Sequence, residues 1–335
     1  MRESDSPGRV IFHQGGTMRT RRAGTAGFFS SARRLTLPLG PSLDPRAVRG
    51  YPIDMRVKAG HPHWPPTWAA SLDGHYVSLI QFGIGCYERF LAGEGEVWLH
   101  TAAAVGRHLV AKQEDDGSWL NWDPFPHTFL LDAPWRCGMA QGEAASLLVR
   151  LFLTTAEPAF ADAARSALTP LTRPREHNGV CAFLDGAPWP EEYPTNPPSF
   201  VLNGAMFAWW GLRDVAVGLG DETAAAAFEA GVDALAANLW RFDTGHWSLY
   251  CLYPLPIQSI ASSFYHALHI SQLQVMNILA PRPEFTVMQK RWVTYVESRR
   301  LRWSAFARKA LFRLIIPRNR LLAERLPWTQ PSTGT

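Results

Sequence analysis

Turns centred on glycine recur along this chain at a nearly constant spacing. DDGSW at 115–119 matches DTGHW at 243–247 as D-x-G-x-W, and HNG at 177–179 is a weaker copy between them. The three glycines lie 62 and 66 residues apart, which leaves room for two helices and a turn in each interval. A fixed period of this length is typical of helical-hairpin repeats. The pattern therefore predicts a mainly α fold.

Apolar residues at spacings of three and four fill the intervals between these turns and predict amphipathic helices. The helices fall in pairs, and Ser199 is the expected N-cap at the start of the third pair. Such pairs predict an α/α toroid, an incomplete barrel of roughly four helical hairpins with short β and turn segments. Its glycine turns would meet at one end and form a binding cleft. The expected helices are 73–92, 94–113, 137–155, 157–170, 199–218, 221–240, 265–280 and 285–300.

The length and composition of the chain are those of a globular protein. With 335 residues, of which 47% are hydrophobic and 19% charged, the chain can bury a large core. The net charge of +4 and the pI near 9.0 suit a polyanionic partner, although solubility alone would explain them, and we expect no nucleic-acid partner.

The spacing of the cysteines bears on metal binding, and the length of the apolar runs bears on where in the cell the protein is expected. Cys86, Cys137, Cys181 and Cys251 are too widely spaced for a zinc site, so we expect neither a metal nor a cofactor. We find neither a secretory signal nor an apolar run long enough to span a bilayer, which favours a cytoplasmic or membrane-peripheral location.

The two ends differ in composition from the middle. Residues 1–50 are basic and lack periodicity, which predicts weak order, whereas 51–298 carry the helical pattern of the expected toroid. Residues 299–335 are expected to form a basic amphipathic helix and a disordered tail. The stretch 299–326 could lie on an anionic membrane surface, or it could pack its apolar side on the toroid, which is slightly favoured. A homodimer is a further candidate assembly.

Three later stretches supply acidic and phenolic side chains. EEYPTNPPSFVLNG at 191–204 places two carboxylates and a tyrosine on a loop that precedes a helix. SLYCLYP at 248–254 and SSFYHALHISQLQ at 262–274 add further tyrosines. These groups can transfer protons or bind hydroxyls, so the three stretches are the candidate reactive parts of the chain.

Two more blocks complete a pattern. GMAQGEAASLLVRLFLTT at 138–155 precedes the three stretches, and F…RW..Y at 285–295 follows them. In this order, over residues 50–296, the blocks resemble the C-terminal catalytic domain of the D-glucuronyl C5-epimerases, which act on heparan-type glycosaminoglycans.

The resemblance implies an isomerase that converts D-glucuronate to L-iduronate residues in an acidic polysaccharide. The C5 proton is removed and a proton is returned on the opposite ring face, so two groups must approach from two sides. The resemblance places the functional residues at Glu192, Tyr193, Tyr250 and Tyr265. We expect Glu192 to work across the ring from Tyr250 or Tyr265, with the choice of base and acid left open.

Other side chains are candidates for holding the sugar. A flat indole face matches a pyranose ring, and a guanidinium matches a carboxylate, so Arg213 and Arg291 are further candidate clamps. The substrate-binding candidates are Glu191, Asn203, His266, His269, Gln272, Trp119 and Arg136.

One block departs from the family. Where the family typically has Tyr-Asp-Leu-Arg-His, this chain has YCLYP at 250–254, without the Asp, the Arg or the His. Because that Arg resembles a contact to the substrate carboxylate, a polymer other than a heparan-type chain is an open alternative. Two other functions also stay open. One is a polysaccharide lyase or other sugar-acting enzyme on this scaffold, and the other is a non-catalytic glycan-binding descendant.

Overall fold

A computed structural model describes residues 10–11, 19–20, 36–66, 76–125 and 128–317 of the chain. The described part is mainly helical, which confirms the mainly α part of the prediction. Most of the N-terminal segment predicted to be weakly ordered, and the tail predicted to be disordered after Pro327, lie outside the described residues.

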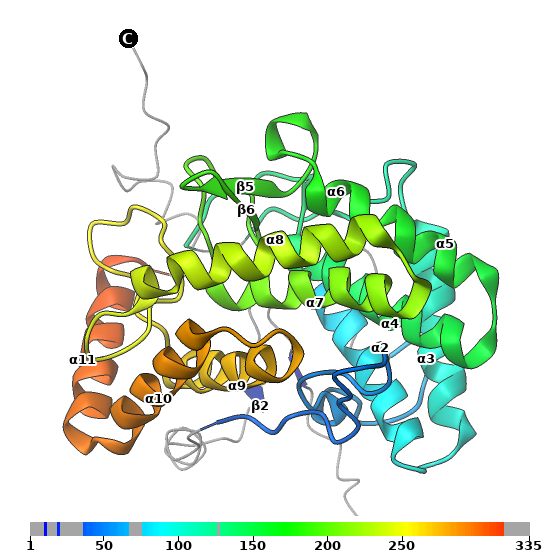
Figure 1. Cartoon of the computed structure of the whole chain (residues 1–335), viewed down its shortest axis with the longest axis horizontal. Helices are drawn as coiled ribbons and strands as arrows, with labels where there is room; N and C mark the ends of the chain where they lie inside the picture. The colour runs from blue at the N-terminus through cyan, green and yellow to red at the C-terminus, as the bar shows by residue number, and fades with distance from the viewer. Residues whose placement is uncertain (1–9, 12–18, 21–35, 67–75, 126–127, 318–335) are drawn as a thin grey trace, which may run out of the picture.

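The long helices pair along the chain as the sequence predicts (Figure 1). Within each pair the two helices pack against one another, because each carries an apolar stripe that needs a partner. The pairs are α2 (Tyr76–Leu91) with α3 (Glu96–Lys112), α4 (Gly138–Thr155) with α5 (Pro158–Ser166), α7 (Leu202–Leu219) with α8 (Glu222–Asn238), and α9 (Ser263–Leu279) with α10 (Pro283–Glu297).

The first helix of each pair forms the centre of the molecule. α2 contacts α4, α4 contacts α7, and α7 contacts α9, so the four make a continuous inner row. α4 and α7 are buried almost all round, whereas α3, α8 and α10 bury only one face. Closure of this row into a toroid stays a prediction.

Short elements connect the pairs. Three two-stranded antiparallel ribbons are present in the described residues, joining β1 (Val10–Ile11) with β2 (Arg19–Thr20), β3 (Leu120–Asn121) with β4 (Trp135–Arg136), and β5 (Cys181–Leu184) with β6 (Ala187–Pro190). The remaining helices are η1 (Arg56–Lys58), α6 (Leu168–Thr172), η2 (Arg175–His177), η3 (Leu239–Phe242) and α11 (Arg299–Ile315). None of the described helices has the length and hydropathy needed to cross a bilayer.

The two D-x-G-x-W turns share one geometry. Gly117 and Gly245 have φ angles of +83° and +78°, which favour glycine because it has no Cβ. The two tryptophans are buried, and their indole N–H groups donate to backbone carbonyls, Trp119 to Leu109 at 2.9 Å and Trp247 to Ala261 at 3.1 Å. The motif therefore fastens each turn to the helical body.

Two predicted helices begin or end elsewhere. The helix predicted over 157–170 is divided into α5 and α6, because Pro170 has no N–H to donate to the carbonyl of Ser166. The helix predicted over 285–300 ends at Glu297, where Ser298 takes an extended conformation and caps α11 instead.

The prediction that Ser199 caps a helix is wrong. α7 begins at Leu202, after Phe200 has taken a positive φ of +47°. The side chain of Ser199 donates to Glu191 rather than accepting from the helix. The chain between the prolines and α7 is therefore shaped by a carboxylate.

Candidate active site

Backbone hydrogen bonds join the three candidate stretches. The N–H of Leu202 donates to the carbonyl of Tyr250 at 3.1 Å, and that of Leu252 donates to Ser199 at 3.0 Å. The N–H of Ala261 donates to Ser248 at 2.9 Å. Loops far apart in sequence thus meet at the N-terminal ends of α7 and α9.

The β5–β6 hairpin delivers the acidic loop to this place. Asp185 and Gly186 form its turn with φ angles of +50° and +80°, as an Asp-Gly hairpin turn requires. Immediately after β6, the N–H of Glu191 donates to Val180 and its carbonyl accepts from Gly138, both at 2.8 Å. A Cβ on Gly138 would lie 2.6 Å from that carbonyl, so glycine is needed where the loop crosses α4.

Glu191 is a buried anchor for the loop. Its carboxylate accepts from the Ser199 N–H at 2.6 Å, the Ser199 hydroxyl at 2.7 Å and the Phe200 N–H at 2.7 Å. Burial raises its pKa to about 7, against the lowering effect of these donors. With both oxygens engaged by the loop itself, Glu191 holds the backbone rather than facing the tyrosines.

Glu192 points the other way, toward α7 and the phenols. The amide nitrogen of Asn203 lies 3.5 Å from its Oε2. Gly204 makes room for it, since a Cβ there would lie 2.5 Å from the same oxygen. Burial raises the pKa of Glu192 to about 7, although hydrogen bonding to Tyr193 and Asn203 lowers it. A carboxylate titrating near neutral pH suits proton transfer.

The three candidate tyrosines gather around this carboxylate. The rings of Tyr250 and Tyr265 are 4.8 Å apart at a steep angle, and both side chains are half-buried. Tyr193 is buried beneath them, and its hydrogen bonding also reaches Tyr250. Burial and then the charge of Glu192 raise the pKa of both Tyr193 and Tyr250 well above 10, so both phenols stay protonated. The structure therefore brings all four candidate catalytic residues together.

An aromatic box fixes the ring of Tyr193. The rings of Phe125, Phe129 and Trp135 have centroids 4.3, 5.1 and 5.9 Å from it. Close aromatic packing restricts the ring to one orientation. Its hydroxyl is consequently held between Glu192 and Tyr250.

The two candidate histidines lie in the interior. Both are fully buried, and their Nδ1 atoms lie 2.7 Å (His266) and 2.9 Å (His269) from the hydroxyl of Ser248. The Ser248 N–H donates to Nδ1 of His266, so Nε2 of that ring carries its proton and donates to the Trp292 carbonyl at 3.2 Å. Burial lowers the pKa of His266 to about 3, so the ring is neutral. These contacts make His266 a tie between the 248–254 turn and α10.

Glu192, Tyr193, Tyr250 and Tyr265 are called the cluster below. Some of the other candidates are neighbours of this cluster, and others lie away from it. Gln272 donates to the Asn203 carbonyl at 3.0 Å, so it supports the residue that faces Glu192. Trp119 is fully enclosed in the core, where its N–H bonds to Leu109. Arg213 pairs with the buried Asp214 at 3.1 Å. The sequence also suggested Arg291, which pairs with Asp243 at 3.0 Å on the second glycine turn.

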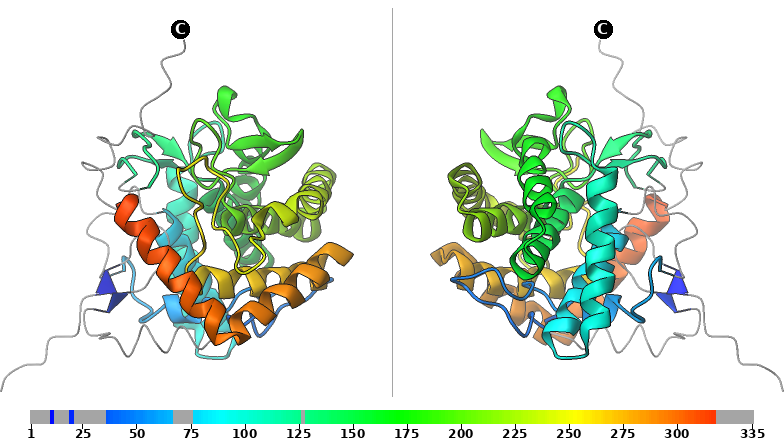
Figure 2. Two further views of the ribbon diagram at one scale, coloured as in Figure 1. Left: turned by 90° about the vertical axis from the view of Figure 1, so that its left-hand side faces the viewer. Right: turned by 90° about the vertical axis from the view of Figure 1, so that its right-hand side faces the viewer.

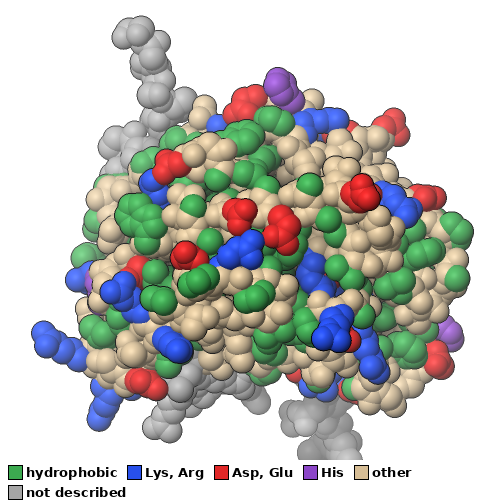
Figure 3. All heavy atoms as spheres, viewed as in Figure 1, with side chains coloured by type: hydrophobic (Ala, Val, Ile, Leu, Met, Phe, Trp, Pro, Cys, Tyr) green, Lys and Arg blue, Asp and Glu red, His purple; other side chains and the backbone are tan. Residues whose placement is uncertain are grey.

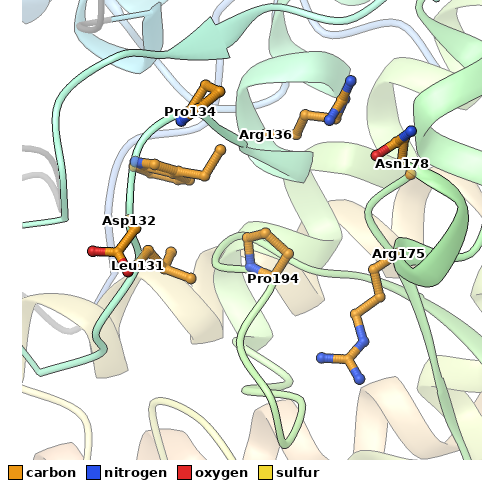
Figure 4. Close-up of a pocket in the computed structure, with 9 residues that line it drawn as sticks. Leu131, Asp132, Pro134, Arg136, Arg175, Asn178 and Pro194 are labelled. Carbon is orange, nitrogen blue, oxygen red and sulfur yellow. The ribbon is translucent and has the colours of Figure 1, made fainter.

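Arg136 lines an open pocket beside the cluster, with a volume of about 240 Å³ (Figure 4). Leu131 and Asp132 lie on one side of Pro194, and Arg175 lies on the other. Arg136 pairs with Asp116 at 2.7 Å, while its buried Nε has no hydrogen-bond partner among the described residues. None of the four cluster residues lines this pocket, but Pro194 directly follows Tyr193 and Trp135 packs on the Tyr193 ring.

Comparison with known proteins covers the same part of the chain. The sequence profile described as D-glucuronyl C5-epimerase C-terminus matches residues 113–294, which include all four cluster residues. The chain belongs to this family. A D-glucuronyl C5-epimerase of Caenorhabditis elegans is 29% identical over a 219-residue alignment that covers 60% of this chain and 36% of that relative. The chain thus spans little more than a third of the relative's length.

The turn at which the chain departs from the C5-epimerase family is well ordered by other contacts. The N–H of Tyr250 donates to the Ser259 carbonyl at 2.7 Å, and Cys251 is buried with its pKa raised to about 11. Tyr253 packs edge-on against Phe129 with ring centroids 5.4 Å apart. An aromatic contact thus occupies the part of the turn where the family carries Arg.

Sequence reasoning missed a third carboxylate behind the cluster. Glu143 on α4 is fully buried and accepts from the amide of Gln81 at 3.1 Å. Burial raises its pKa to about 8, Lys58 on η1 lowers it, and the charge of Glu192 raises it further. The signal was an isolated Glu in the apolar run of the 138–155 block. Among the described residues, no group of three or more His, Cys, Asp or Glu is placed to hold a metal ion.

Proposed function

We propose that this chain is a uronate C5-epimerase that converts D-glucuronate to L-iduronate residues within an acidic polysaccharide. The observation that carries the proposal is the convergence of Glu192 with Tyr250 and Tyr265. A buried carboxylate titrating near pH 7 beside protonated phenols supplies both a base and an acid. Epimerisation by proton removal and return needs both.

Glu192 is the base in this proposal. Its carboxylate takes the C5 proton, and the electrons of the C–H bond pass into the adjacent sugar carboxylate as an enolate. Tyr250 or Tyr265 then donates its phenolic proton to the other face of C5. The raised pKa of Tyr250 supports the role of acid, since such a phenol is a poor base at neutral pH.

Tyr193 can return the base and the acid to their starting protonation states. After one turnover Glu192 holds a proton and the donating tyrosine lacks one. The hydroxyl of Tyr193 bonds toward both Glu192 and Tyr250, so when Tyr250 is the donor one proton can pass along this row and restore the starting state. Its aromatic box holds the hydroxyl in line for the transfer.

The neighbouring pocket supports a polymeric acidic substrate. Arg136 and Arg175 both line it, and so does Pro194, which directly follows Tyr193 along the loop. A guanidinium recognises a carboxylate or sulfate through paired N–H groups. We assign this pocket to an acidic sugar that flanks the reacting unit, and Asn203 and the phenols to the reacting carboxylate and hydroxyls.

The test is deuterium incorporation at C5 from heavy water into glucuronate polymers, read by NMR together with chain length. Epimerisation predicts exchange and iduronate signals without cleavage. An absorbance band from a 4,5-unsaturated product would instead favour a lyase, which starts from the same proton abstraction but expels the C4 substituent. Binding without exchange across a panel of uronate polymers would support the glycan-binding alternative.

A further inference from the structure

α11 has two apolar faces, and only one of them is used by the fold. Its inner face buries Ala305 and Phe312 against the body. On its outer face Trp303 is 58% exposed and Leu314 is 82% exposed. A helix that only packed on the body would carry polar residues outside, so the outer face calls for another explanation.

The outer apolar residues form one continuous stripe. The helical period places Leu314 within about 20° of Trp303 and Phe312 on the opposite side. Phe306 and Leu311, which are 43% and 52% exposed, flank the stripe, and the rings of Trp303 and Phe306 pack edge-on at 5.9 Å. Figure 2 (left) shows α11 lying obliquely across one end of the molecule.

Basic residues surround this stripe, and the helix carries no acid. RRLRWSAFARKALFRLI at 299–315 has six basic residues and neither Asp nor Glu. Arg308, Lys309 and Arg313 bond to the body, through His246, the Ile260 carbonyl and Thr128. By contrast, the face of the molecule in Figure 3 carries acidic and basic side chains together.

Arg299 and Arg300 stand apart from these three. Both are exposed on either side of Trp303, and no side-chain bond to either occurs among the described residues. Positive charge in the first turn opposes the helix dipole, so these two arginines weaken the helix in isolation. Their placement is explained if they face negative charge outside the chain.

We propose that α11 docks the protein flat on an anionic lipid surface, with the Trp303–Leu314 stripe in the interface and Arg299 and Arg300 on the headgroups. An exposed aromatic and aliphatic stripe flanked by arginines is the pattern of interfacial helices. A second copy of the chain is disfavoured, because two such helices would bring like charges together. A free polysaccharide would engage the arginines but leave Leu311 and Leu314 in water. The proposal is independent of the epimerase activity.

The experiment is co-sedimentation of the full chain with vesicles of phosphatidylcholine alone or mixed with phosphatidylglycerol. Binding is expected only to the anionic vesicles, and it should weaken as salt rises because the attraction is screened. Trp303→Ser with Leu314→Ser should weaken binding on the order of tenfold or more. Arg299→Gln with Arg300→Gln should weaken it by about 30-fold.

Matched variants control for general loss of apolar area or charge. Trp240→Ser removes a tryptophan that is 64% exposed on η3, and Arg46→Gln with Arg49→Gln removes two exposed arginines from another segment. Both should bind as the unchanged chain does. Equal binding to neutral vesicles, or equal losses in the control variants, would overturn the proposal. So would a dimer in light scattering that Leu314→Ser dissociates, which would assign the face to a second copy.

Discussion

The adjacent carboxylates Glu191 and Glu192 are alike in burial and in pKa but differ in their hydrogen-bond partners. Both are buried, and burial raises the pKa of each to about 7. Glu191 accepts from Ser199 and Phe200 of its own loop, whereas Glu192 faces Tyr193 and Asn203. Burial and a perturbed pKa therefore do not distinguish a reacting group from an anchor, and the partners of each group do. The comparison between the Glu191 anchor and the Glu192 cluster can be tested by changing each in turn.

Glu192→Gln should produce the largest effect. The amide fills the same space but cannot accept the C5 proton, so C5 exchange should fall by about 10³–10⁴-fold. The thermal midpoint should change little, because the amide oxygen of Gln can still accept a hydrogen bond from Tyr193 or Asn203. The matched control is Glu191→Gln, the same change one residue earlier. Exchange retained in Glu192→Gln would remove Glu192 from the mechanism.

Tyr250→Phe and Tyr265→Phe test which phenol is the acid. Each change deletes one hydroxyl and keeps the ring that packs on the other. Replacing the donating tyrosine should lower the rate of C5 exchange by about 10²–10³-fold. Replacing the other should lower it less, since that tyrosine only holds the substrate. Heavy-water exchange and circular dichroism on the two variants would measure this. Equal, small losses would mean that neither phenol delivers the proton.

The pH dependence of kcat/KM follows from the state of Glu192. A base works when deprotonated, and its pKa is about 7, so the rate should fall tenfold per pH unit below 7, about 100-fold at pH 5. The pKa of Tyr250 lies well above 10, so no matching fall is expected between pH 7 and 10. A rate that is flat from pH 5 to 8 would contradict a carboxylate base with this pKa.

Glu191→Gln should cost stability rather than chemistry. Its amide NH₂ cannot accept from Ser199 or Phe200, so at least one buried N–H loses its partner, at a cost of about 2 kcal/mol. Because the folded pKa of Glu191 lies above the ordinary 4.5, the unchanged chain loses part of its stability as pH rises from about 4.5 to 7. The variant should show a weaker slope in thermal unfolding across that range, with exchange per folded molecule preserved.

The helices were predictable from sequence because their apolar spacing reports a local period. The hairpin of β5 and β6 was not predicted, although Asp185-Gly186 carries its turn signal. The start of α7 was misplaced because Ser199 is a good cap in isolation, and only the tertiary bond to Glu191 diverts it. The order of the family blocks predicted that Glu192 and the tyrosines meet. The anchoring contacts of Glu191 depend on donors fixed by the fold, so no sequence pattern could reveal them.

Ser248→Ala tests whether the buried histidines are anchors in the same sense as Glu191. The change removes the hydroxyl between His266 and His269 and keeps the backbone N–H that donates to His266. The hydroxyl lies within hydrogen-bond distance of both rings, so up to two neutral hydrogen bonds are lost, at about 1 kcal/mol of stability each, with exchange at C5 unchanged. Chemical denaturation and the exchange assay on the same sample would measure both. A large fall in exchange with stability intact would instead place the histidines in the chemistry. Glu191 alone would then remain an anchor.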